Sequence, residues 1–153
     1  MFLLRITQAF QNANIPYALV GGYAVALHGA VRGTIDVDII ITLNQKSFKE
    51  TESLLLQFGL QPRLPIKAQD LFENREHYIQ EKNLIAWSFV NPDKPIECLD
   101  IIITEDLSHK KVISKHVGEQ SIHVLEINDL IAMKKLSGRP QDIEDIKALE
   151  ALS

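Results

Sequence analysis

Two aspartates, Asp36 and Asp38, lie in an apolar segment that reads Gly-Thr-Ile-Asp-Val-Asp-Ile-Ile-Ile-Thr. This segment is typical of a strand, and strand side chains alternate between faces, so both carboxylates are expected on one face. Like charges this close repel, and one stays protonated unless a cation lies between them. Magnesium suits such a pair, because proteins commonly bind it with one or two carboxylates plus substrate phosphates. The pair predicts a magnesium site, and the alternative is a solvated strand edge.

A third aspartate, Asp100, lies in the apolar run Glu-Cys-Leu-Asp-Ile-Ile-Ile. Burying an ionised carboxylate without a partner is costly, so something must compensate its charge. The functional interpretation is a metal ligand or a base beside the first pair. The alternatives are a salt bridge to Arg32 or to a lysine, or an outward-facing side chain on an edge strand.

Two consecutive glycines, Gly21 and Gly22, follow the short apolar run 17–20 and precede helix-forming residues up to His28. They are expected at a strand-to-helix turn. Glycine there lets the backbone approach a phosphate, and the helix that follows offers unpaired N–H groups to anionic oxygen. The alternative is a tight turn with no ligand.

These residues form one pattern with two further side chains: Gly21-Gly22, then Arg32-x-Thr34-x-Asp36-x-Asp38. The pattern resembles the signature of the polymerase-β-type nucleotidyltransferase superfamily. The chain is similar in particular to small bacterial nucleotidyltransferases of the kind that includes abortive-infection toxins and antibiotic adenylyltransferases. The second glycine stands where many relatives have a serine, so a hydroxyl contact to phosphate is missing.

The resemblance implies a magnesium-dependent (or manganese-dependent) enzyme that moves a nucleoside monophosphate from a triphosphate such as ATP to an acceptor hydroxyl and releases pyrophosphate. The implied metal ligands and catalytic residues are Asp36, Asp38 and Asp100, of which Asp100 also helps to deprotonate the acceptor. The implied nucleotide-binding residues are Gly21, Gly22, Arg32, Thr34 and Lys134. The segment 129–145 resembles the tail of such proteins, where a lysine at the position of Lys134 reaches the phosphates; a solvated helix lysine is the alternative.

The acceptor stays open between a small molecule such as an antibiotic, a protein side chain and a tRNA end. The alternative function is a non-catalytic nucleotidyltransferase-like subunit that acts as a binding module or as the antitoxin of a toxin, against which the three intact aspartates speak. A toxin-antitoxin partner or a second copy of the chain is the expected protein partner.

Length and composition limit the kinds of protein that this chain can be. The 153 residues are expected to form one domain, 1–153, that is long enough to bury a core. The net charge of −4 argues mildly against a broad nucleic-acid surface. The single cysteine, Cys98, excludes a disulfide within the chain and is expected in the core. No apolar run has bilayer length and no signal peptide is expected, so a cytoplasmic protein without a membrane segment is predicted.

The expected fold is α/β, with a small mixed sheet, helices mainly on one face and a helical C-terminal segment. Helices are expected over 2–13 and 44–58, over 105–116, and in the tail from Asn128 and from Pro140. A hairpin of strands 83–90 and 96–103 is expected to bring Asp100 into the sheet, and 121–127 is expected as the last strand. Asp142 and Asp145 are expected in solvent. No element is predicted for 60–80, which is interpreted as a loop or lid near the site.

Overall fold

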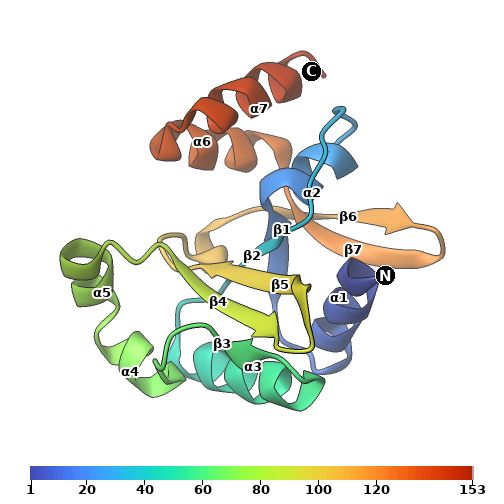
Figure 1. Cartoon of the computed structure of the whole chain (residues 1–153). Helices are drawn as coiled ribbons and strands as arrows, with labels where there is room; N and C mark the ends of the chain where they lie inside the picture. The colour runs from blue at the N-terminus through green and yellow to red at the C-terminus, as the bar shows by residue number, and fades with distance from the viewer. Residues whose placement is uncertain (153) are drawn as a thin grey trace.

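A computed structural model describes residues 1–152. Its strands form one mixed sheet in the order β3-β4-β5-β2-β1-β7-β6 (Figure 1). The strands are β1 (Tyr17–Val20), β2 (Val37–Ile41), β3 (Gln61–Pro62), β4 (Ala86–Asn91), β5 (Lys94–Ile102), β6 (Val112–Val117) and β7 (Gln120–Leu125). The helices are α1 (Phe2–Asn12), α2 (Gly21–Leu27), α3 (Gln45–Phe58), α4 (Ala68–Glu73), α5 (Arg75–Lys82), α6 (Ile127–Ser137) and α7 (Pro140–Glu150), with a short 3-10 turn, η1 (Leu107–His109). The predicted α/β class is confirmed.

The centre of the sheet mixes strand directions. β2 runs antiparallel to β1 and parallel to β5, and β1 runs parallel to β7 on its other side. The predicted hairpin is confirmed as β4 and β5, which pair antiparallel from Ala86 opposite Ile102 down to the turn. The central strands are therefore hydrogen-bonded on both edges, which fixes the register of every side chain on them.

One face of the sheet carries most of the packed core. Leu19, Ile39 and Ile101 are fully buried on this face, and α1 and α3 lie over it. Phe10 of α1 packs on Tyr17 with ring centroids 5.6 Å apart. Aromatic packing continues where Phe48 of α3 stacks on Trp87 of β4 at 5.6 Å. In Figure 1, α6 and α7 lie together on the other side of the molecule from α3.

The boundaries of α3 follow from local capping. Asn44 precedes the helix, and its side chain accepts a hydrogen bond from the backbone N–H of Ser47 at 2.8 Å. Gly59 ends the helix in the left-handed conformation, with φ of 105°, which a residue with a side chain adopts only at a cost. Both were predicted from the sequence, and both are confirmed.

The helices expected over 105–116 and from Asn128 differ from the structure. The helix expected over 105–116 is wrong: only η1 is helical there, and β6 follows as the edge partner of β7. In β6 exposed and half-buried residues alternate, which is the strand period, but basic side chains interrupt the apolar pattern. The tail helix also begins earlier than expected, because the side chain of Glu126, and not that of Asn128, accepts from the first backbone N–H groups of α6.

The segment 60–80 is folded. It forms β3, α4 and most of α5, and Phe72 of α4 packs edge-on against Phe48 at 5.8 Å. The interpretation of this segment as a loop is therefore wrong, because short helices with weak apolar periodicity gave no sequence signal. Within residues 1–152 no helix is long and apolar enough to cross a membrane.

Candidate active site

A row of side chains crosses the sheet on the face opposite the aromatic core. Val20 of β1 pairs with Asp38 of β2, Asp38 pairs with Asp100 of β5, and Asp100 pairs with Ser88 of β4. Residues directly opposite each other on neighbouring strands share a face and have Cβ atoms about 5 Å apart. The register therefore places the carboxylates of Asp38 and Asp100 side by side, as the sequence predicted for a third carboxylate from a neighbouring strand.

Asp38 is the most perturbed carboxyl of the row. Burial of the group, together with the negative charges of Asp100 and Asp36, raises its pKa from 3.8 to about 7. Arg139 opposes this shift but does not cancel it. A carboxyl placed where its own ionised form is disfavoured is suited to binding a cation.

The pKa of Asp38 predicts an unusual dependence of stability on pH. Because the folded protein holds this proton more tightly than the unfolded chain, the free energy of unfolding should fall as the pH rises from about 4 to about 7 through this group. Urea unfolding of wild type and of Asp38→Asn at matched pH values measures the difference. The difference between the two should change across this window, and a constant difference would show that Asp38 titrates normally.

Asp36 occupies a different position from the one predicted. β2 begins at Val37, so Asp36 precedes the strand and is exposed, although its charge still acts on Asp38. Within residues 1–152, no three His, Cys, Asp or Glu side chains are grouped closely enough to hold a metal ion by themselves. The candidate donor set is thus the pair Asp38 and Asp100, with Asp36 at its edge. Such a pair fits magnesium when substrate phosphates supply further ligands.

The orientation of Asp100 is set by its neighbour on β4. The hydroxyl of Ser88 donates to Asp100 Oδ1 at 2.6 Å, and the thiol of Cys98 lies 3.8 Å from the same oxygen. Cys98 is buried, as predicted. These contacts hold the carboxylate of Asp100 in place.

The two glycines pack directly against the functional side chains. Gly21 has φ of 71°, and a Cβ built on it would lie 2.1 Å from Asp38 Oδ2. A Cβ on Gly22 would lie 2.7 Å from the side chain of Thr34. The glycines are the first residues of α2 and do not form a separate turn before it. Glycine is required here because the backbone itself approaches the carboxylate.

A buried cluster of charges joins the connection between α2 and β2 to the C-terminal helices. Lys134 Nζ lies 3.0 Å from Asp145 Oδ2 and 3.6 Å from Asp142 Oδ1. Arg32 Nε donates to Asp145 Oδ1 at 2.9 Å. Asp142 and Asp145 are only 1% and 2% exposed, so the expectation that they lie in solvent is wrong. Their spacing of three residues on α7 places both toward Lys134.

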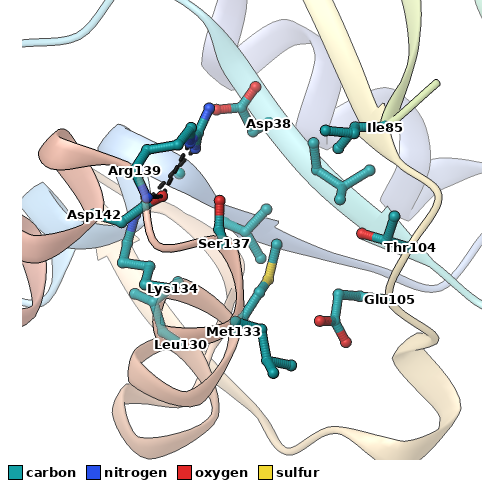
Figure 2. A pocket seen from close by; sticks show the side chains of 14 residues that line it. Asp38, Ile85, Thr104, Glu105, Leu130, Met133, Lys134, Ser137, Arg139 and Asp142 are labelled. Carbon is teal, nitrogen blue, oxygen red and sulfur yellow. Dashed lines mark hydrogen bonds and ion pairs between the residues drawn. The ribbon is translucent and has the colours of Figure 1, made fainter. Parts of the chain in front are cut away.

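Arg139 is a site residue that the sequence reasoning did not single out. Its guanidinium donates to Asp142 Oδ2 at 2.9 Å. Figure 2 shows the same guanidinium pointing toward the carboxylate of Asp38, and the charge of Arg139 lowers the pKa of Asp38. A signal was present, since Pro140 predicts a helix start and therefore places Arg139 at the end of the connection.

Two cavities meet at Asp38. One, of about 470 Å³, has apolar walls from Ile102, Leu130 and Met133 (Figure 2). The other, of about 740 Å³, is bordered by the loop that carries Arg32 and Thr34. The residues that line both are Gly21, Asp38, Lys134, Arg139 and Asp142. All seven residues predicted in the glycine-to-aspartate pattern and the tail line the second cavity, namely Gly21, Gly22, Arg32, Thr34, Asp36, Asp38 and Lys134.

Comparison with known proteins identifies the fold. No protein-family model matches the chain, and no curated protein sequence matches it. A lincomycin-bound lincosamide antibiotic adenylyltransferase, LnuA, is similar over 99% of this chain and 96% of its own, with a TM-score of 0.62 and 18% identity. The chain has a nucleotidyltransferase fold.

Two further solved structures share this fold. The antibiotic-resistance factor ANT(2'')-Ia is similar with a TM-score of 0.64 and 11% identity, over 99% of this chain and 83% of that one. A nucleotidyltransferase-like antigenic protein from Paracoccidioides brasiliensis is similar with a TM-score of 0.61 and 19% identity, over 97% of this chain and 73% of that one. The predicted resemblance to the nucleotidyltransferase superfamily, including its antibiotic adenylyltransferases, is confirmed at the level of the fold.

Proposed function

We propose that the protein is a magnesium-dependent nucleotidyltransferase, which moves a nucleoside monophosphate from a triphosphate to an acceptor hydroxyl. The observation that carries the proposal is the juxtaposition of Asp38 and Asp100 in register on parallel strands, with Gly21 packed against Asp38. The fold shared with adenylyltransferases supports it. A purely non-catalytic binding subunit would not need a carboxyl whose ionisation is so strongly disfavoured.

Asp38 and Asp100 would hold the divalent cation, magnesium or manganese, with Asp36 as a further ligand at the edge of the pair. When bound, the metal supplies charge neutralisation for the phosphate oxygens. The charge of Asp100 is one cause of the raised pKa of Asp38. A bound cation between the two carboxylates would relieve this repulsion.

The triphosphate is assigned to the second cavity. Gly21 and Gly22 line this cavity, and Arg32, Thr34 and Lys134 border the same space. Lys134 is held by Asp142 and Asp145, and Arg139 by Asp142, so these cations are oriented before a nucleotide arrives. Such prior orientation lowers the reorganisation that binding requires.

The chemical step is a single displacement at the α-phosphorus. The acceptor oxygen forms a bond to the α-phosphorus, the bond from that phosphorus to the pyrophosphate oxygen breaks, and Asp100 takes up the acceptor proton. ATP is the first triphosphate to test, and the acceptor hydroxyl belongs to a small molecule, a protein or a nucleic-acid end. A toxin-antitoxin partner or a second copy of the chain belongs to the same proposal as an expected assembly.

Calorimetry tests the binding step. Each nucleoside triphosphate is titrated into the protein with magnesium and with chelator. Binding should require the metal, and metal alone should bind weakly, because the two carboxylates need the phosphates to complete the site. Nucleotide binding that is indifferent to chelator would contradict the proposed site.

Gly21→Ala is expected to abolish activity and triphosphate binding. A new Cβ would displace the carboxylate of Asp38, and the positive φ adds strain of roughly 1–2 kcal/mol. Gly118→Ala is the matched control: its φ is 62°, it lies in the turn between β6 and β7, and a Cβ there would meet nothing within 4 Å. The control should lose similar stability and keep full activity. Equal activities of the two variants would show that Gly21 has only a backbone role.

A further inference from the structure

The row of site residues continues beyond Asp100 to a side chain that the proposed function does not use. The backbone N–H of Arg63, just after β3, donates to the carbonyl of Ser88 at 2.9 Å. The guanidinium of Arg63 reaches back over β4 and donates to Cys98 Sγ at 3.3 Å. The order across the sheet is therefore Val20, Asp38, Asp100, Ser88 and Arg63, and Gly21 directly follows Val20.

Arg63 is held differently from the other arginines near the site. Arg32 and Arg139 are each paired with a carboxylate at 2.9 Å. The hydrogen bond that the structure records for the guanidinium of Arg63 is to a thiol, which is a weak acceptor. Arg63 is exposed, and the charges of Asp100 and Asp36 act on it. Its remaining N–H groups are thus available to a ligand that arrives at Asp100.

The geometry of phosphoryl transfer indicates which substrate binds beside Asp100 and Arg63. In an in-line transfer, the attacking oxygen approaches the phosphorus from the side opposite the leaving pyrophosphate. The pyrophosphate lies at the glycine end of the row in the proposed function, on which this inference rests. The acceptor must then enter from the Asp100 end, past Ser88 and Arg63.

We infer that Arg63 binds the acceptor, and that the acceptor carries a phosphate group next to its reactive hydroxyl. A guanidinium recognises phosphate through two parallel hydrogen bonds, which a neutral group cannot replace. The bound phosphate fixes the neighbouring hydroxyl beside Asp100, the group that takes its proton. Two sources share this chemistry: the end of a nucleic-acid strand and a small phosphate ester.

The test measures binding of a labelled five-nucleotide RNA with a free 3'-hydroxyl, by fluorescence anisotropy, with magnesium and a non-hydrolysable triphosphate present. A second RNA is identical except for a neutral methylphosphonate at its last linkage. Glycerol 3-phosphate, added as a competitor and as an acceptor, tests the small ester.

Wild type should bind the charged acceptor more tightly than the neutral one in at least one of two comparisons. These are the phosphodiester RNA against the methylphosphonate RNA, and glycerol 3-phosphate against glycerol. Arg63→Gln should bind the charged acceptor about tenfold more weakly, because it loses a hydrogen bond between two charged groups. Arg63→Lys should keep part of this affinity. Lys46→Gln, which removes one exposed positive charge on α3, should change nothing.

Three outcomes overturn the inference. The first is a wild type that does not discriminate between charged and neutral acceptors in either arm. The second is an Arg63→Gln variant that discriminates between the acceptors as wild type does. Tighter manganese binding by that variant would then show that Arg63 only offsets the charges of Asp36 and Asp100. The third is absent triphosphate binding in wild type calorimetry, which removes the proposed function as well and so is distinguishable from the first two.

Discussion

Asp38→Asn is expected to abolish nucleotidyl transfer and to leave the ligand-free protein at least as stable as wild type at pH 8. The substitution keeps the shape of the side chain and removes the charge that binds metal. At this pH the wild-type carboxyl is ionised against burial and against the charges of Asp100 and Asp36, so its removal relieves repulsion. Melting curves with and without triphosphate and magnesium measure both effects.

Wild type should gain stability from the nucleotide with magnesium by mass action, and the variant should gain none. Asp93→Asn is the matched control, because Asp93 is an exposed aspartate in the turn between β4 and β5. It should behave as wild type in every respect. If Asp38→Asn melted clearly lower and still responded to nucleotide, Asp38 would be a scaffold residue and the catalytic role would be wrong.

The largest loss of stability is expected from Asp145→Asn. Asp145 accepts from Arg32, Lys134 and Gln141, and the asparagine leaves Lys134 buried with one carboxylate fewer. Removal of one partner from a buried ion pair costs about 3 kcal/mol, because the remaining charge stays desolvated. Urea unfolding measures this, and nucleotide affinity should fall as well, since Arg32 loses its anchor.

Glu144→Gln on the same helix is the control for Asp145→Asn. Glu144 and Lys147 are both more than half exposed, and Lys147 Nζ lies 3.7 Å from Glu144 Oε1. The loss of unfolding free energy should therefore stay below about 0.5 kcal/mol. An Asp145→Asn variant as stable as Glu144→Gln would show that the cluster is not a structural unit.

The same cluster predicts that the protein loses stability in acid. Hydrogen bonds from Arg139 hold the pKa of Asp142 at about 2, below its usual 3.8. The stabilisation from Asp142 is therefore complete above pH 4 and is lost as the pH falls toward 2.

Much of the site could be predicted from the sequence because its signals are local. The strand period predicts that Asp36 and Asp38 share a face, and the family resemblance implies that Asp100 joins them from a neighbouring strand. The structure places Asp100 opposite Asp38. The glycine pair is predicted by its position between a strand and a helix. Asp36 shows the limit of the argument: the period is right only where the strand has begun, and β2 begins one residue later.

The C-terminal cluster could not be predicted, because its partners are far apart along the chain. Asp145 bonds to Arg32 across 113 positions, and charged residues on a helix are usually solvated. Nothing local distinguishes Asp145 from Glu144, although one is buried and the other exposed. Arg63 could not be predicted for a similar reason: it directly follows a two-residue strand, which is too short to show a period.

The proposed transfer is tested most directly by the position of a radiolabel. The protein is incubated with magnesium, candidate acceptors and ATP labelled either at the α-phosphorus or at the γ-phosphorus, and then with the other triphosphates. Nucleotidyl transfer predicts that acceptor label comes only from the α-position, with labelled pyrophosphate released from the γ-labelled substrate, and that Asp38→Asn shows neither. Acceptor label from the γ-position, or equal α-label transfer by Asp38→Asn, would contradict the account.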